Sequence, residues 1–280
     1  MYNILVVMVT TKEKKMKKLF TALLAVLMVL TLAACGGSNE PTVVEVDPNA
    51  KSEGSMTYAE YVAAEDGTDI TIEGFVTATA YNAKYGNVNL YMQDGDGAYY
   101  VYRMNVTEEE AAKLVPGTKI VVKGSKGSWG GELEVAEGTG TFSVSSEETW
   151  TPAAKDVTSL MNDESLIDNQ NQFVSISGAK VVESTYDEKD DEGNVVATHT
   201  DAFWYGWENN SEKGSNADLY FNIEVDGTVF NVCVESDECP EGTAVYSAVE
   251  TLNVGDTVDL EGYLYWYWGA NLHVHSAVVK

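Results

Sequence analysis

Short stretches in which apolar and polar residues alternate recur along the chain from residue 56 onward. They cover residues 70–76, 88–92 and 98–104, and residues 94–97 place Asp-Gly-Asp-Gly between the second stretch and the third. Successive side chains of a strand point to opposite faces, so this alternation predicts half-buried β-strands. The Asp-Gly sequence predicts a hairpin between two of them.

Two sequences typical of helix starts flank these strands. Thr57 is followed by Glu60, and Thr107 by Glu110. In such a capping box, the threonine hydroxyl and the glutamate carboxylate bind free backbone amides at the start of a helix. Short helices are therefore predicted before the first strand and after the third, and two more strands follow the second helix.

The stretch at residues 114–124 recurs near the end of the chain, at residues 252–262. Both copies have an apolar start, a turn glycine, an alternating strand and a closing glycine. After a shift of one residue, Trp129, Leu133 and Val135 of the first copy match Trp268, Leu272 and Val274 of the second. A repeat of this kind predicts two copies of one domain.

The second copy repeats the order of elements found in the first. Residues 173–178 match the first strand, residues 217–225 and 228–235 form a hairpin through an Asp-Gly turn, and a helix falls near residues 242–252. The chief difference is an insertion at residues 184–216, which contains an acidic hairpin and then an aromatic cluster.

The order strand, strand, strand, helix, strand, strand resembles the OB-fold, a small Greek-key barrel. The resemblance covers the chain from about residue 56 to its end and depends on strand patterns rather than on a specific motif. It implies a mainly β fold of two tandem OB-fold-like Greek-key β-barrels, each with a short helix between strands 3 and 4.

The N-terminal residues have the features of an export signal. Four lysines between positions 14 and 18 precede an apolar run at residues 19–34. The run is shorter than the roughly 20 apolar residues of a spanning helix and ends in small residues, as cleaved signal peptides do. Met16 opens a more typical signal than Met1, so the sequence leaves the start codon undecided.

Residues 32–35, Leu-Ala-Ala-Cys, resemble the lipobox of bacterial surface lipoproteins. The resemblance implies that Cys35 becomes the mature N-terminus and carries a diacylglyceryl membrane anchor with acyl chains such as palmitate. Two acyl chains hold a protein stably at the membrane, whereas one binds only marginally. It also implies an exported protein on the outer face of the cytoplasmic membrane of a Gram-positive bacterium. An ordinary signal peptide or a signal anchor is the alternative.

These patterns together predict the organisation of the whole chain. It comprises a lipoprotein signal peptide at residues 1–34, a flexible tether at 35–55, OB-like domain 1 at 56–148, a linker at 149–171, and OB-like domain 2 at 172–280 with its insertion at 184–216.

The composition is acidic and rich enough in apolar residues for packed cores. The chain has 44 Asp and Glu against 17 Lys and Arg, a formal net charge of −27, and 44% hydrophobic residues. Proteins that bind nucleic acids take much of their affinity from basic side chains that neutralise phosphates. The charge therefore argues against nucleic acid as a partner.

Aromatic residues occur where OB-folds bind ligands, in the loop after the first strand and the loop between the fourth and fifth strands. The candidate ligand-binding residues are Tyr81, Tyr85 and Trp129 in the first copy and Trp204, Tyr205, Trp207, Trp266 and Trp268 in the second. Alternation places Tyr263, Tyr265 and Tyr267 on one side of their strand and Trp266 and Trp268 on the other. Two interpretations stay open: these rings stack on a ligand, or they form a satellite core or the contact between the domains.

Other candidate chemistry is weaker. His273 and His275 share one face of a strand, but no third ligand follows at metal-binding spacing, so no metal and no cofactor is predicted. Cys233 and Cys239 form a disulfide or remain free thiols, and the sequence does not decide between the two. No recognisable nucleophile, base or phosphate loop stands out, which predicts a protein that is not an enzyme.

The sequence thus predicts a lipid-anchored cell-surface binding module for an envelope or dietary carbohydrate. A structural or docking lipoprotein that binds other envelope proteins is the alternative, and OB-type nucleic-acid binding is the least favoured option.

Overall fold

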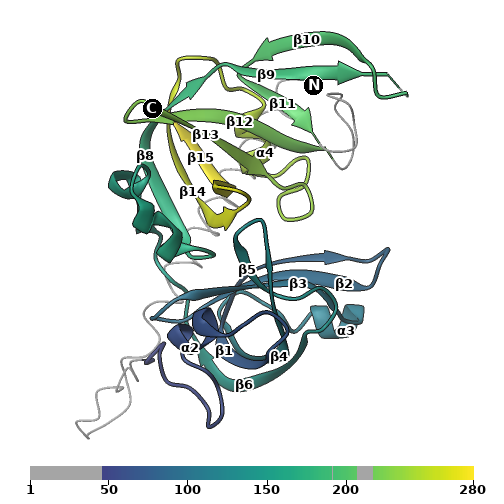
Figure 1. Cartoon of the computed structure of the whole chain (residues 1–280), viewed down its shortest axis with the longest axis vertical. Coiled ribbons are helices and arrows are strands. Elements are labelled where there is room, and N and C mark those ends of the chain that lie inside the picture. Colours follow the sequence, from purple (N-terminus) through teal and green to yellow (C-terminus); the bar gives the residue numbers. More distant parts are fainter. Residues whose placement is uncertain (1–45, 191, 207–216) are drawn as a thin grey trace, which may run out of the picture. The chain divides into compact units, whose positions relative to one another are not determined.

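The structure is a computed structural model that describes residues 46–190, 192–206 and 217–280. Val46–Lys280 forms one compact unit that contains two tandem five-stranded β-barrels (Figure 1). The predicted mainly β, OB-fold-like architecture is therefore confirmed. No helix in the described part of the chain is long and apolar enough to span a membrane.

The first barrel follows the predicted order of elements and adds one strand. Its elements are α2 (Tyr58–Ala63), β1 (Asp69–Asn82), β2 (Asn87–Gln93), β3 (Ala98–Asn105), α3 (Glu108–Ala111), β4 (Thr118–Trp129), β5 (Glu132–Val135) and β6 (Thr141–Thr149). The sheet order is β1-β2-β3-β5-β4-β6, and an additional pairing of β1 with β4 closes the barrel. The sequence pattern did not predict β6 as a further strand, because this edge strand is largely exposed and polar.

Both predicted capping boxes are formed. The hydroxyl oxygen of Thr57 accepts a hydrogen bond from the amide of Glu60 at 3.2 Å, and the amide of Thr57 donates to the Glu60 carboxylate at 2.8 Å. Thr107 and Glu110 make the same pair of bonds at the start of α3. The alternating strands bury Ile72, Leu90 and Ile120 completely in the barrel core.

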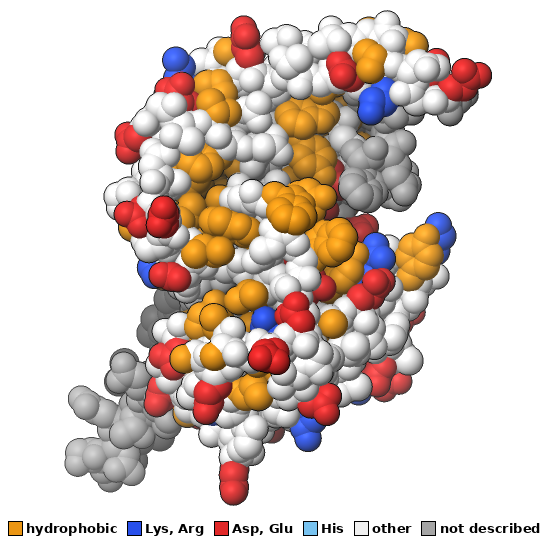
Figure 2. Space-filling model, in the orientation of Figure 1, with side chains coloured by type: hydrophobic (Ala, Val, Ile, Leu, Met, Phe, Trp, Pro, Cys, Tyr) orange, Lys and Arg blue, Asp and Glu red, His pale blue; other side chains and the backbone are white. Residues whose placement is uncertain are grey.

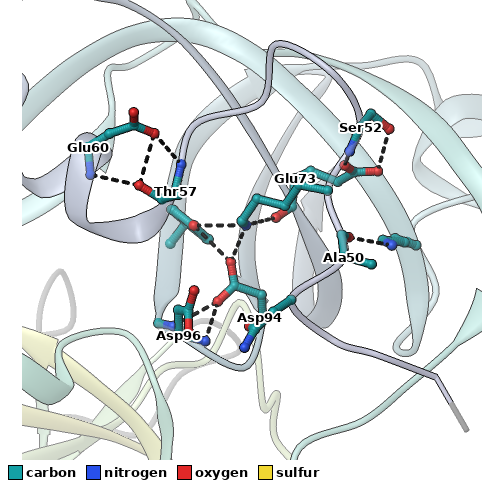
Figure 3. A network of polar contacts seen from close by, with 12 residues as sticks. Ala50, Ser52, Thr57, Glu60, Glu73, Asp94 and Asp96 are labelled. Atoms are coloured by element: carbon teal, nitrogen blue, oxygen red, sulfur yellow. Dashed lines mark hydrogen bonds and ion pairs between the residues drawn. The ribbon is translucent and has the colours of Figure 1, made fainter.

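Residues 50–55 pack on the first barrel, which corrects the prediction of a flexible tether up to residue 55 (Figure 3). Lys51 forms an ion pair with Asp94 and donates to the carbonyl of Glu73 at 2.9 Å, and the hydroxyl of Ser52 donates to the Glu73 carboxylate at 3.1 Å. Asp94 and Glu73 are only 1% and 2% exposed, so their carboxylates require such partners. This polar segment is therefore fixed by buried charges that no local sequence pattern reveals.

The second barrel repeats the same construction. Its elements are β7 (Lys155–Asp156), the 3₁₀ helices η1 (Thr158–Leu160) and η2 (Glu164–Asn169), β8 (Phe173–Val182), β11 (Phe203–Gly206), β12 (Asp218–Val225), β13 (Thr228–Val234), α4 (Ala244–Val249), β14 (Thr257–Trp266) and β15 (Ala270–Val279). The sheet order is β11-β12-β13-β15-β14-β8-β7, and β12 also pairs with β8. The predicted acidic hairpin of the insertion consists of β9 (Ser184–Lys189) and β10 (Val195–Asp201), which form a sheet of their own.

Equivalent pairings close the two barrels and confirm the internal repeat. In each barrel the third and fifth strands run parallel, with Tyr100 opposite Glu134 in one and Cys233 opposite His273 in the other. The fourth strand pairs antiparallel with both the first and the fifth. Each barrel has its own buried apolar core.

Candidate functional site

The two hairpins between the fourth and fifth strands, one from each barrel, meet at their tips. The β4–β5 hairpin turns at Gly130 and Gly131, and the β14–β15 hairpin turns at residues 267–269. Gly131 and Tyr267 form an isolated antiparallel bridge, and the amide of Trp268 donates to the carbonyl of Gly130 at 2.7 Å. Loops that the sequence places 138 residues apart, from 130 to 268, therefore form one site.

This contact depends on the glycines of the first hairpin. A Cβ atom on Gly131 would lie 2.8 Å from Cδ1 of Trp266, and one on Gly130 would lie 3.2 Å from Cδ2 of Tyr267. Both glycines also have positive φ angles, 62° for Gly130 and 96° for Gly131, as a two-residue hairpin turn requires. The adjacent glycines were the one sequence signal that could have revealed this close approach.

Three large aromatic side chains are exposed around the joined tips. The exposed fraction is 79% for Trp268, 63% for Trp129 and 52% for Tyr267. We call these three residues the hairpin platform. The predicted candidates Trp129 and Trp268 thus belong to one surface, and Tyr267 joins them although it was not among the candidates.

Trp268 occupies a strained backbone conformation. Its φ angle is 57°, in the left-handed region that a bulky L-residue rarely adopts. The conformation costs on the order of 1–2 kcal/mol. Glycine adopts this conformation without that cost, so a largely exposed tryptophan is unusual at this position.

The remaining aromatic candidates lie elsewhere, and most contribute to packing. Trp266 and Tyr205 are half-buried and pack against the core of the second barrel, while Tyr81 packs against the core of the first. Trp204 lies between two stacked rings, 5.9 Å from Tyr186 and 5.4 Å from Tyr220 between centroids. These contacts support the interpretation of the four residues as a satellite core, whereas a ligand-binding role for them stays a prediction.

Tyr85 and Trp207 are the last two aromatic candidates. Tyr85 is 65% exposed, but it lies in the β1–β2 turn, where the amine of Lys84 sits 4.8 Å from its ring centroid. Trp207 lies outside the described residues. Tyr85 is not part of the hairpin platform.

The tyrosine side of β14 forms a contact between the barrels, one of the two interpretations left open by the sequence. Tyr263 stacks on Tyr91 with a centroid distance of 4.4 Å and an interplanar angle of 12°. Tyr265 meets the edge of Tyr100 at 5.5 Å. These rings form a third apolar cluster that contains side chains of both barrels.

A buried carboxylate connects the two hairpins beneath the platform. Glu132 is completely buried and accepts hydrogen bonds from the backbone amide of Trp266 at 2.8 Å and from the side-chain amide of Asn171 at 2.5 Å. Burial raises its pKa to about 8, although the two hydrogen bonds partly oppose the rise. Gln170 adds further support, because its side chain binds the amide of Leu133 and the carbonyl of Gly131.

The chain as a whole is acidic, with a formal net charge of −27. On the face shown in Figure 2, acidic side chains are more widespread than basic ones. Glu134, two residues beyond Glu132, has its pKa raised to about 7 by burial and by the nearby charges of Glu137 and Asp66. A polyanionic ligand would be repelled by the net negative charge of the chain.

The two histidines considered as metal ligands have carboxylate partners. His275 lies 2.9 Å from Glu238, and His273 lies 3.6 Å from both Glu238 and Glu235. Burial alone would raise the pKa of Glu238, but the hydrogen bonds with both histidines lower it to about 2. Cys233 and Cys239 are buried free thiols, so the disulfide that the sequence allowed is not present in this structure.

Comparisons with known proteins show distant similarity only. No protein-family model and no curated protein matches the chain. The p204 HINb domain is 13% identical over 78% of this chain and 100% of its own, with a TM-score of 0.33. The Ifi202 HINa domain, solved in complex with double-stranded DNA, is 13% identical over 77% and 96%, with a TM-score of 0.32. The single-stranded DNA binding protein of Thermus aquaticus is 13% identical over 77% and 94%, with a TM-score of 0.22. All three TM-scores are below 0.5, so these similarities carry no argument about what this chain binds.

Proposed function

We propose that this chain is a non-catalytic binding protein that holds a neutral carbohydrate on the hairpin platform. The observation that carries the proposal is Trp268, which is 79% exposed in a backbone conformation that disfavours it. Trp129 and Tyr267 add two further exposed rings at the same joined tips.

Flat, exposed aromatic rings suit the apolar faces of sugar rings. A tryptophan offers a large rigid surface with few rotatable bonds, so stacking costs little conformational entropy. The tips are fixed from below by Glu132 and Gln170, which reduces the entropy that binding would otherwise cost. A neutral glycan also avoids the repulsion that a chain of net charge −27 exerts on polyanions.

The proposal includes an anchor at Cys35. The Leu-Ala-Ala-Cys sequence at residues 32–35 supports acylation of this cysteine. The anchored protein would present the platform outside the cytoplasmic membrane. We expect Cys35→Ser to move the protein from the membrane fraction to the soluble fraction, and retention of this variant in the membrane would contradict the anchor.

The binding experiment uses a glycan array followed by tryptophan-fluorescence titration. We expect Trp268→Ala to weaken binding at least about 5-fold, which corresponds to the loss of about 1 kcal/mol of stacking. Tyr85→Ala is the matched control, because it removes another exposed ring outside the platform and should leave affinity unchanged.

Two outcomes would point to other functions. Capture of an envelope protein that depends on Trp268, without any response to glycans, would favour a docking lipoprotein. Exposed rings can also stack on bases, so binding of single-stranded nucleic acid at physiological salt would replace the carbohydrate proposal with an OB-type nucleic-acid function.

A further inference from the structure

Four side chains with metal-binding atoms lie on one face of the second barrel's sheet. Asp218 begins β12, Cys233 lies near the end of β13, Glu235 follows that strand, and His273 lies in β15. Cys233 is directly opposite His273, and the pairing of Leu219 with Val234 brings Asp218 next to Glu235. The neighbouring residues Leu219, Val234 and Leu272 point to the core, so the four side chains share the opposite face.

Three of the four ligand residues already lie close together, and His273 lies next to one of them, Glu235. One atom each from Asp218, Cys233 and Glu235 lie within 4.8 Å of one another. The Glu235 carboxylate is 3.7 Å from the Cys233 sulfur, and it is 3.6 Å from Nε2 of His273. In a tetrahedral zinc site, bond lengths of about 2.0–2.3 Å place neighbouring ligand atoms roughly 3.3–3.8 Å apart. Both of these measured separations fall in that range.

The charge balance favours a bound cation. Glu235 and Glu238 contact His273 and His275, and Asp218 lies close to Glu235, so three carboxylates face at most two positive charges. Asp218 is only 7% exposed, so little water screens its repulsion by a neighbouring carboxylate. A divalent ion would neutralise the cluster.

We propose that Asp218, Cys233, Glu235 and His273 bind a Zn²⁺ ion. A set of one sulfur, one imidazole nitrogen and two carboxylate oxygens suits zinc, whereas calcium and magnesium prefer oxygen ligands alone. Zinc binding would deprotonate the Cys233 thiol and release that proton to solvent. The sequence pointed to His273 as a possible metal ligand but not to its partners, because Asp218, Cys233 and His273 lie on three different strands.

Neighbouring groups are arranged to hold the ligands in place. The amide and the hydroxyl of Ser236 donate to Oδ1 of Asp218 at 2.8 and 2.7 Å, which leaves Oδ2 for the ion. The hydroxyl of Tyr91 lies 3.0 Å from Nδ1 of His273, so it can fix the ring with Nε2 toward the ion. Tyr91 belongs to β2 of the first barrel, so the ion would also stiffen the contact between the barrels.

The test measures zinc in the full-length chain, purified in detergent and equilibrated with Zn²⁺ before removal of free metal. Mass spectrometry of the metal content should find a single zinc per chain. Replacement of zinc by Co²⁺ should give a thiolate-to-cobalt charge-transfer band in the near ultraviolet. No bound zinc, or a cobalt spectrum without this band, would overturn the proposal.

Two cysteine variants separate the site from non-specific binding. Cys233→Ser should lower zinc affinity by more than the roughly 10- to 100-fold loss typical of outer-shell changes, whereas Cys239→Ser should retain the ion. Equal loss in both variants would contradict the assignment.

Further variants guard against an effect of misfolding. If Cys233→Ser fails to fold, Glu235→Gln serves instead, because the Glu235 side chain is 30% exposed and tolerates the change. Retention of wild-type zinc affinity by Glu235→Gln would also overturn the proposal. Tyr91→Phe removes a positioning hydroxyl and should weaken binding about 10- to 100-fold while the cobalt charge-transfer band persists.

Discussion

The two barrels differ most at a pair of hairpins that occupy the same place in each. The β4–β5 hairpin has Gly130 and Gly131 at its tip, whereas the β14–β15 hairpin has Tyr267, Trp268 and Gly269. The two glycines leave space for the aromatic side chains of the β14–β15 hairpin, because a Cβ atom on either glycine would contact one of them. The two copies of the fold therefore carry complementary loops at this position.

The largest expected effect concerns Glu132, the first-barrel residue that binds a backbone amide of the second. Its pKa rises from the ordinary 4.5 to about 8 on folding, so the folded state holds a proton that the unfolded state releases above pH 4.5. Stability should fall between pH 4.5 and 8 by up to about 1.4 kcal/mol per pH unit. We expect Glu132→Gln to match the wild type near pH 5 and to exceed it by a few kcal/mol at pH 9, measured by urea unfolding.

If the stability of the wild type and that of Glu132→Gln fall equally as the pH rises, groups other than Glu132 cause the loss. Asn171 makes the exchange feasible, because its side-chain oxygen is buried without a hydrogen-bond partner and can accept from the new amide after a flip.

The next prediction tests whether contact between the two hairpins requires glycine at the tip of the β4–β5 hairpin. Gly131→Ala should destabilise the protein by about 2–4 kcal/mol, because the new methyl group meets Trp266 and the backbone conformation is unfavourable for alanine. Gly255→Ala is a matched control: its φ is 98° against 96° for Gly131, yet nothing lies within 4 Å of its Cβ position. The difference between the two variants in thermal unfolding isolates the contact, and equal losses would mean that the tips do not depend on close approach.

A smaller effect distinguishes the proposed role of Trp268 in binding from its effect on the free energy of unfolding. Trp268→Gly should raise stability by about 1 kcal/mol, since glycine adopts a φ of 57° freely. The same variant should lose glycan binding, a combination that calorimetry and fluorescence titration can detect together. Loss of stability would show that Trp268 belongs to the packing of the hairpins.

Much of the fold follows from local patterns, but the site does not. Alternation and Asp-Gly turns predicted the strands and hairpins, and Thr-x-x-Glu predicted α2 and α3, because each depends on neighbours in the sequence. Whether Trp204 and Trp266 pack or bind a ligand could not be decided from the sequence, because the side chains that contact them come from other strands. The place of Trp268 beside the β4–β5 hairpin depends on a contact between segments far apart in the sequence, so no local pattern could predict it.

The fixed segment around Lys51 limits how far a membrane-anchored protein could reach. Only 11 residue steps separate Cys35 from Val46, where the compact unit begins. A fully extended chain of that length spans at most about 40 Å. If Cys35 carries the proposed anchor, the barrels sample a thin layer next to the lipid surface, and a polymer that fills this layer would be met far more often than one released into the medium.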